Sequence, residues 1–566
     1  MKSFSIFLGS LSILLISGLA APDLRAATIT VTETADSFDN TGCSLREAIQ
    51  EMNTNGGYSS GCTETGPFGS DDTIVLTAQT YVLSVSGGVG EDDNAFGDLD
   101  VHVSLNITGA GSTQTAISAS GFAQADLDRV MHIVELVNGT GGFTPSITVN
   151  ISGLTIRDGD TETNSSGGGG GLAINFSQAS VNLDDVTFDN NRCSGDGGGV
   201  ANSNAVLVVD NSFFTGNSAT SDAGALNNNT SGTTVVLNTT MEENFSPDDG
   251  GAIQNFGTMM VVNSTINNNT CVEEESEAII AGPVFLQGDG GGISVGGGIF
   301  LMINSTVSNN EAGNRGGGID VIGPSTNGDG PPASVALFNT TVAQNSVLST
   351  GGFGGGICHN CEIQPQGLTS EVQLANSLIA ENQAANFPDC AGDFASSGYN
   401  LATDDSGCNG LTATGDQTNV AAGIGPLQNN GGPTETHALL EGSLAIDRAT
   451  PPGDGGCEAP NVQDFINSGG TIFLEVLTED QRGLTRPVAV LDPAVAVCDI
   501  GAYEFQIAEP TPTPTATPLP PPGAQLLEGS GCSLNPFSAA SSGAGLWLAL
   551  GTIAGICGFR RRKSGE

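Results

Sequence analysis

The chain has 566 residues and a formal net charge of −47, with 82 glycines and 5% aromatic residues. Its two lysines, Lys2 and Lys563, lie in the terminal segments, so the body carries only a few arginines as basic groups. Nucleic-acid binding needs a basic surface, and this composition therefore excludes a nucleic-acid-binding protein. Such a length is typical of several domains, but one long repeat architecture also accommodates it.

Residues 1–26 are predicted to form a secretory signal peptide. Lys2 precedes the apolar run Phe4–Leu19, and small residues follow it. Export agrees with the count of twelve cysteines, because disulfides persist in oxidising compartments. Connectivity does not follow from sequence, but local spacing favours three pairs: Cys43 with Cys62, Cys390 with Cys408, and Cys457 with Cys498.

Residues 27–70 are predicted to form an N-terminal cap. Ser44–Met52 has the pattern of a short helix, with Ser44 as N-cap and Glu47 at the capping-box position. A cap is needed here because an open strand edge invites pairing with other chains.

An acidic segment follows the cap. The run from Glu91 to Asp100 contains five carboxylates, and oxygen-rich loops of this kind can bind Ca²⁺. The alternative is a solvated acidic turn, since the spacing is not that of an EF-hand. The candidate calcium ligands are Glu91, Asp92, Asp93, Asp98 and Asp100.

Residues 71–400 carry the repeats that determine the fold. An apolar residue, two variable residues and Asn recur seven times, with the apolar residues separated by 26, 27, 25, 41, 35 and 37 residues. Gly-rich phrases lie between copies, and the segment has no helix-length apolar period to serve as a crossover. The pattern predicts an all-β chain, a right-handed parallel β-helix whose coils stack directly on each other. The apolar positions are Phe188, Phe214, Met241, Ile266, Val307, Val342 and Ile379.

Two further expectations follow from the repeat. The apolar residues should point inward in one column, and each Asn should bond the matching Asn one coil away. The longer spacings should be loops inserted into single coils at Cys271–Asp289, Gly323–Pro332 and His359–Thr369, on one face of the stack.

Catalytic residues are hard to find in this composition. A polysaccharide lyase needs a strong base beside acids that hold a cation, and the weak candidates are Arg315, Arg192 and Asp189. Hydrolysis needs paired carboxylates, which 61 acids supply by chance. The four histidines, His102, His132, His359 and His437, have no spacing that indicates a shared site. Cys358 and Cys361 have the spacing of half a zinc site or of a redox pair, but a structural disulfide or local loop staple is favoured.

The C-terminal part is predicted to contain a spacer and an anchor. Residues 508–528 form a Pro/Thr-rich linker, which is stiff and extended. Residues 529–566 contain Cys532, the apolar stretch Gly543–Phe559 and the basic end Arg560–Lys563, in the order of a bacterial sorting signal with a membrane segment. Cys532 is a candidate for processing and lipid attachment, or an unmodified thiol.

Several families resemble this chain. Cys43-Ser-Leu-Arg-Glu-Ala48 resembles the signature of bacterial CSLREA-domain proteins, which commonly continue into a right-handed β-helix. Gly250-Gly-Ala-Ile253 and the Phe188 and Phe214 copies resemble the repeats of chlamydial polymorphic outer membrane proteins. Residues 401–507 are similar to the choice-of-anchor domain, which precedes surface-sorting signals, in phrases such as Cys498-Asp-Ile-Gly-Ala-Tyr-Glu504. None of these resemblances supplies a catalytic residue.

The sequence therefore predicts an extracellular protein, held on the cell surface by its C-terminal segment. Its role is expected to be binding, adhesion or structural, towards glycans or other cell-surface components, with no cofactor except possible Ca²⁺. The alternative is a polysaccharide lyase or glycoside hydrolase on the same scaffold. Clustered acids with a convergent Arg along one sheet would favour the enzyme, whereas a plain Gly, Asn and Thr face would favour display.

Overall fold

The structure is a computed structural model in which part of the chain is described. The described residues are 26–39, 41–86, 92–124, 126–135, 145–161, 168–273, 286–322, 332–361, 370–451, 457–460, 474–491 and 496–506. The predicted signal peptide, linker and sorting segment, with Cys532, lie outside them, as do Glu91 and most of the three predicted loop insertions.

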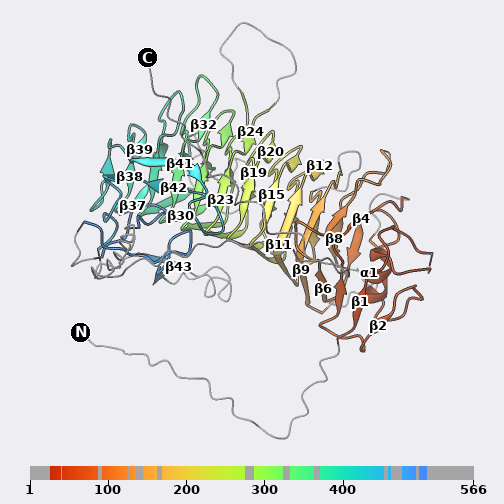
Figure 1. Cartoon of the computed structure of the whole chain (residues 1–566). Helices are drawn as coiled ribbons and strands as arrows, with labels where there is room; N and C mark the ends of the chain where they lie inside the picture. The colour runs from red at the N-terminus through yellow and green to blue at the C-terminus, as the bar shows by residue number, and fades with distance from the viewer. Residues whose placement is uncertain are drawn as a thin grey trace, which may run out of the picture. The chain divides into compact units, whose positions relative to one another are not determined.

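Most strands belong to a stack of parallel coils, seen in Figure 1 running from α1 to β38. Two adjoining columns form a 23-stranded sheet, sheet A. One column contains β1 (Thr28–Thr30), β3 (Thr73–Val75), β6 (Leu105–Thr108), β9 (Ile147–Arg157), β11 (Ala179–Asp189), β14 (Val206–Asp210), β18 (Thr233–Leu237), β22 (Thr258–Val262), β26 (Ile299–Ile303), β30 (Ser334–Phe338), β34 (Glu371–Ala375) and β37 (Ala395–Gly398). The other contains β4 (Thr80–Val82), β7 (Ala116–Ser118), the second halves of β9 and β11, β15 (Phe213–Thr215), β19 (Thr240–Glu242), β23 (Thr265–Asn267), β27 (Thr306–Ser308), β31 (Thr341–Ala343), β35 (Leu378–Ala380), β38 (Leu401–Ala402) and β40 (Gln417–Thr418).

Two more sheets complete the coils. Sheet B contains β5 (Leu99–Val101), β8 (Met131–Val134), β10 (Leu172–Asn175), β13 (Val200–Asn202), β17 (Leu226–Asn228), β21 (Ile253–Asn255), β25 (Ile293–Val295), β29 (Ile319–Val321), β33 (Ile357–His359), β36 (Cys390–Asp393) and β39 (Cys408–Asn409). Sheet C contains β12 (Arg192–Cys193), β16 (Ser218–Ala219), β20 (Phe245–Ser246), β24 (Thr270–Cys271), β28 (Glu311–Ala312) and β32 (Ser346–Val347). The predicted right-handed parallel β-helix is confirmed.

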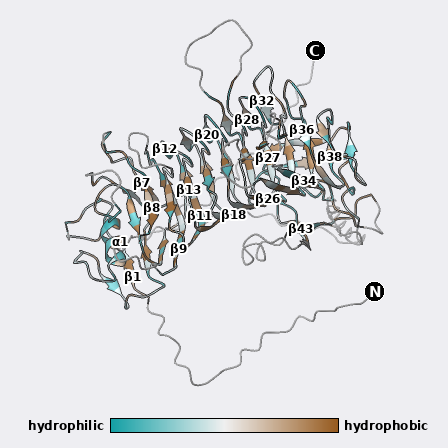
Figure 2. Ribbon diagram, turned by 180° about the vertical axis from the view of Figure 1, so that it is seen from behind, coloured by the Kyte–Doolittle hydropathy of each residue, from teal (hydrophilic) through white to brown (hydrophobic). Residues whose placement is uncertain are grey.

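The predicted apolar column is also confirmed. Phe188 pairs in register with Phe214, and the same register continues through Met241 to Ile379. All seven side chains are at most 1% exposed, and the two phenylalanine rings stack 4.7 Å apart. In Figure 2 the hydrophobic colouring lies mainly on the strands of the stack. The repeat period therefore sets the core directly, because equal positions in successive coils become neighbours.

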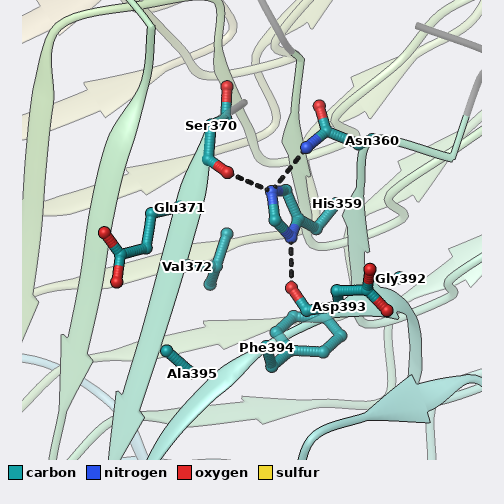
Figure 3. Close-up of a pocket in the computed structure, with 9 residues that line it drawn as sticks. All are labelled: His359, Asn360, Ser370, Glu371, Val372, Gly392, Asp393, Phe394 and Ala395. Carbon is teal, nitrogen blue, oxygen red and sulfur yellow. Dashed lines mark hydrogen bonds between the residues drawn. The ribbon is translucent and has the colours of Figure 1, made fainter. Parts of the chain in front are cut away.

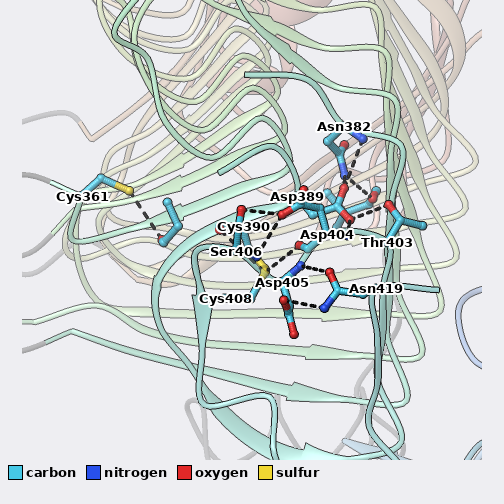
Figure 4. Close-up of a disulfide and its surroundings, with 12 residues drawn as sticks. Cys361, Asn382, Asp389, Cys390, Thr403, Asp404, Asp405, Ser406, Cys408 and Asn419 are labelled. Atoms are coloured by element: carbon cyan, nitrogen blue, oxygen red, sulfur yellow. Dashed lines mark hydrogen bonds between the residues drawn. A yellow bond between two sulfur atoms is a disulfide. The ribbon is translucent and has the colours of Figure 1, made fainter. Parts of the chain in front are cut away.

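The repeated asparagines form the predicted ladder. The side-chain amide of each donates to the amide oxygen of the next at 2.9–3.0 Å, from Asn191 through Asn382. Each also donates to a backbone carbonyl of the preceding coil, as Asn217 does to Phe188 at 2.9 Å. The ladder ends at Asp389, whose Oδ1 accepts from Asn382 and whose Oδ2 accepts from Thr403 (Figure 4).

Left-handed backbone positions recur at the turns. Gly250 has φ +64°, and a Cβ there would collide with the carbonyl oxygen of Ile253. Asn263 has φ +52°, in the Asn-Ser-Thr phrase that precedes the apolar residue. Gly and Asn tolerate this conformation best, which explains why the turn phrases repeat with the coils.

The cap has the predicted helix, α1 (Leu45–Asn53), with the capping box between Ser44 and Glu47. Arg46 is fully buried and donates to both carboxylate oxygens of Asp36 and to the backbone carbonyls of Gly97 and Asp98. β1 pairs in parallel with β3 and antiparallel with β2 (Glu64–Thr65), so the cap supplies the first strand of sheet A. The hexapeptide 43–48 thus joins the cap to the stack.

The predicted β-helix covers residues 71–400, but the coils continue beyond residue 400 as far as β40. Beyond it, β41 (Ile424–Gln428) and β42 (Thr436–Leu439) form one antiparallel pair, and β43 (Glu458–Pro460) and β44 (Leu474–Val476) form another. This C-terminal flank lies on the outer face of sheet A. The buried Gln481 amide donates to Ser264 O at 3.1 Å and accepts from Thr306 Oγ1 at 2.6 Å.

Four disulfides are present among the described residues. Three join the pairs favoured from sequence, with Cα separations of 4.4 Å for Cys43–Cys62, 5.0 Å for Cys390–Cys408 and 6.1 Å for Cys457–Cys498. The fourth joins Cys358 to Cys361, the local staple favoured over a zinc site. Figure 4 shows Cys390 and Cys408 beside the end of the asparagine ladder.

Candidate functional site

Four aspartates occupy the same place in successive coils, directly before the Gly-rich turns. Backbone hydrogen bonds align Asp196, Asp222, Asp249 and Asp289, and Arg315 takes this place in the next coil. Neighbouring parallel strands are about 4.8 Å apart, so these side chains form a row, which we call the aspartate ladder. The repetition of equal positions that builds the core therefore also concentrates charge.

The middle of the ladder has carboxyl groups with raised pKa values, and one end of it has an ion pair. Burial, with the carboxylates of Asp196 and Asp248 nearby, raises the pKa of Asp222 to about 7. Burial and neighbouring carboxylates raise the pKa of Asp249 well above its usual value. Arg315 forms an ion pair with Asp289, and both side chains are largely buried. An ion-paired guanidinium is held in its charged form, so Arg315 is unsuited to act as a base.

A row of buried polar side chains lies beside the ladder, at the middle position of successive strands in sheet B. Asn227, Gln254 and Ser294 are each at most 1% exposed. Neither the oxygen nor the nitrogen of the Gln254 amide has a hydrogen-bond partner in the described part of the chain. Buried polar groups of this kind usually bind ordered water or a ligand.

The three catalytic candidates from sequence are not brought together. Arg192 lies on β12 and is separated by four steps of sheet C from Glu311, which shortly precedes Arg315. Four coils correspond to about 19 Å. Asp189 lies in the coil of Arg192, and burial raises its pKa. The three candidates therefore do not converge on one reacting point.

A pocket of ≈ 370 Å³ lies near the C-terminal end of the stack, between β33, β34 and β36. It is lined by His359, Asn360, Ser370, Glu371, Val372, Gly392, Asp393, Phe394 and Ala395. Glu371 and Asp393 are exposed, whereas His359 and Phe394 are buried. Figure 3 shows the imidazole in the middle of these residues, with the two carboxylates on opposite sides of it.

The imidazole of His359 is held by three partners. Nδ1 bonds the backbone carbonyl of Asp393, and Nε2 lies 2.7 Å from the Asn360 amide nitrogen and 3.1 Å from the carbonyl of Ser370. These bonds fix the ring and engage both nitrogens. The pocket therefore offers two exposed carboxylates for binding, while its histidine and the Asn360 amide nitrogen are engaged by the protein itself and Phe394 is buried.

The structure does not bring all the predicted calcium ligands together in one site. Asp98 lies 3.3 Å from the Arg129 guanidinium, and Glu91 is outside the described residues. Asp92 and Asp100 instead face His132, whose Nδ1 lies 3.4 and 3.6 Å from their carboxylate oxygens. Burial and the charge of Arg129 lower the pKa of His132 to about 3. Sequence reasoning missed His132, because no repeat phrase marks its register with Asp100.

Comparison with known proteins gives one family match. The model of the Chlamydia polymorphic membrane protein repeat matches residues 185–203, which include Phe188, Asn191 and the first Gly-rich phrase. No curated protein matches the chain.

Several solved structures, among them the following three, are similar to this chain at low sequence identity. Pectate lyase Pel9A has a TM-score of 0.40 and 12% identity, over 77% of this chain and 88% of that one. The A-module of the Azotobacter vinelandii mannuronan C-5 epimerase AlgE6 has a TM-score of 0.29 and 14% identity, over 69% and 98%. The A-module of the Azotobacter vinelandii epimerase AlgE4 has a TM-score of 0.26 and 13% identity, over 68% of this chain and 96% of that one. Likeness at this level carries no information on activity.

Within the described ranges, no helix combines the length and the apolar content that a membrane crossing requires.

Proposed function

We propose that this protein is exported, displayed on the cell surface and binds glycans there through the pocket around His359. The observation that carries this proposal is the pocket itself, which has two exposed carboxylates, of Glu371 and Asp393, in a volume of ≈ 370 Å³. Carboxylates accept hydrogen bonds from sugar hydroxyls, and a concave site of this size is typical of small-ligand binding. Surface display is supported by the signal-peptide pattern and by the chlamydial repeat match.

Charge narrows the class of glycan. Glu371 and Asp393 make the pocket acidic, and the whole chain has a net charge of −47. Like charges repel, so uronate-containing polymers are disfavoured unless a cation intervenes. The ligand is therefore a neutral or amino-sugar glycan on another cell or in the surrounding matrix.

A carbohydrate-active enzyme is the second candidate. The same two carboxylates could act as acid and base in glycoside hydrolysis, which needs a pair flanking the scissile bond. The aspartate ladder with Arg315 supports a lyase less, because Arg315 is engaged by Asp289. We therefore prefer hydrolysis to lyase chemistry as the form of this alternative.

The test uses the purified chain on a glycan array, followed by calorimetry and a reducing-sugar assay on each glycan bound. We expect retention of neutral or amino-sugar glycans without cleavage. Glu371→Gln and Asp393→Asn should weaken binding about tenfold, roughly 1.4 kcal/mol. Glu441→Gln, which alters an exposed carboxylate elsewhere, is the matched control and should bind normally.

Two outcomes would overturn the binding proposal. Release of new reducing ends that Glu371→Gln abolishes would establish the enzyme instead. Equal binding by the wild type and both pocket variants would place the ligand elsewhere on the molecule.

A further inference from the structure

His132 and Asp100 are neighbours because of strand register. β5 pairs in parallel with β8, and this pairing sets Asp100 opposite His132. Residues in register on adjacent strands point to the same side, so the imidazole and the carboxylate meet outside the apolar core. Asp92, from the turn before β5, approaches the same imidazole from the solvent side, with a side chain that is 53% exposed.

The geometry is that of metal ligands rather than of hydrogen bonds. The Nδ1 atom of His132 lies 3.4 Å from Asp92 and 3.6 Å from Asp100, beyond the usual N–H···O distance. The three ligand atoms all lie within 4.8 Å of one another. A tetrahedral ion with bonds of about 2.0–2.1 Å requires ligand atoms about 3.3–3.4 Å apart, so a small closure of this cluster would suffice.

The other side of the imidazole is held in place. His132 Nε2 lies 3.0 Å from the side-chain nitrogen of Asn175, and Asn175 Oδ1 accepts from Ser203 at 2.6 Å. Rotating the Asn175 amide by half a turn would let its oxygen accept a hydrogen bond from the N–H at Nε2, while its nitrogen donates a hydrogen bond to Ser203. Ligand histidines typically have such a partner on the nitrogen that faces away from the metal.

The nearby arginines contact other carboxylates. Arg129 forms an ion pair with Asp98, and Arg46 donates to both carboxylate oxygens of Asp36. The cluster around the imidazole therefore combines one nitrogen with two carboxylates. Calcium prefers six to eight oxygen ligands, whereas zinc-type ions accept this mixed set of three and complete their coordination with water.

We propose that Asp92, Asp100 and His132 bind one divalent transition-metal ion of the zinc type. The ion would join β5, β8 and the turn before β5. That turn region is also contacted by Arg46 of α1, through the carbonyls of Gly97 and Asp98. Binding would thus fix the junction between the cap and the first coils, and an exposed Asp92 would leave the ion accessible from solvent.

Calorimetry on the metal-stripped chain tests the proposal. Zn²⁺ is titrated in a buffer with excess Ca²⁺, which occupies sites made of carboxylates alone. We expect one Zn²⁺ per chain, and a thermal midpoint that rises on binding. Asp92→Asn should weaken binding at least about tenfold, and His132→Gln should abolish it. Asp71→Asn, a change of an exposed acid outside the cluster, is the matched control and should bind as the wild type does.

Co²⁺ in place of Zn²⁺ adds a readout that does not depend on stability. Its visible spectrum should change when His132 is replaced, since the imidazole is a ligand. His132 is buried, so Asp92→Asn, which alters a largely exposed side chain, decides the case if His132→Gln fails to fold. Absence of Zn²⁺ binding in excess Ca²⁺, or equal affinity in wild type and Asp92→Asn, would overturn the proposal.

Discussion

Asn244 illustrates how one residue type supports every coil. Its amide nitrogen donates to Asn269 at 2.9 Å and to the carbonyl of Phe214 at 3.1 Å, and its oxygen accepts from Asn217. The side chain is 1% exposed, so water does not replace these bonds if they are lost. Removing the amide leaves buried groups of two neighbouring coils unpaired.

We expect Asn244→Ala to lower the free energy of unfolding by about 2–4 kcal/mol, because buried polar groups without partners each cost about 1–3 kcal/mol. Urea denaturation of the two proteins measures the change. Asn409→Ala is the control: its side chain is exposed and makes one bond, to Asp393. Equal losses in both variants would contradict a special role for the ladder.

Asp222 makes stability depend on pH. Its pKa is raised from 3.8 to about 7, so the folded state holds a proton that the unfolded state releases above pH 4. Its contribution is therefore fully present below about pH 4 and is lost as the pH rises through 7. Asp222→Asn keeps the neutral shape, and it should stabilise the protein by up to about 4 kcal/mol at pH 8 but hardly at all below pH 4.

Urea titrations at the two pH values measure this difference. Asp71→Asn, at an exposed aspartate, should show no such pH dependence. A stabilisation that is the same at both pH values would mean that folding does not shift the pKa of Asp222.

At the scale of elements, the cap depends on the disulfide between Cys43 and Cys62. The bridge links the residue before the N-cap of α1 to the segment that leads into β2. In the chain-entropy model, a bridge that closes a loop of this size is worth about 3 kcal/mol. The double variant Cys43→Ser/Cys62→Ser should therefore lose about that much stability against denaturant.

Local unfolding should follow from the same change. Hydrogen exchange should become faster in α1 and β1, while the coils around Asn244 keep their protection. The bridge between Cys358 and Cys361 is a useful comparison, because it closes a much shorter loop and should contribute less, about 2 kcal/mol. Unchanged exchange in α1 after the double substitution would show that packing alone holds the cap.

At the scale of the whole molecule, two parts of the chain follow the coils. The C-terminal flank contacts the β-helix through buried polar groups, including Arg486, which donates to Asn304 at 2.9 Å. Within the flank, Arg486 is held by an ion pair with Glu504 at 3.2 Å. The flank also covers outward apolar residues of sheet A, such as Met260, Leu301 and Phe338. The flank therefore shields sheet A surface that would otherwise face solvent.

The apolar stretch at residues 543–559 remains a predicted anchor, outside the described residues. Deleting residues 543–566 should release the protein into the medium, because the flank and the coils would keep no hold on the membrane. Cell fractionation with immunoblotting measures this. A deletion of residues 564–566 alone, which keeps the apolar stretch and the basic end, should stay with the cells. Retention of the longer deletion as well would show that attachment runs through the body.

The sequence by itself determined the β-helix, its apolar column from Phe188 to Ile379 and its asparagine ladder. These features depend on equal positions in successive coils, and a repeat period converts sequence spacing into spatial contact. The capping box at Ser44 was also predictable, because it is local.

Only the tertiary structure decided the sites. Asp100 and His132 meet through the register of two coils that carry no repeat phrase, and the pocket combines His359, Glu371 and Asp393 from separate strands. Gln481 reaches Ser264 across 217 residues. Such contacts depend on loop lengths and on where a segment folds back, which the local pattern does not encode. The repeat therefore specifies the scaffold, while its irregular parts specify the candidate functions.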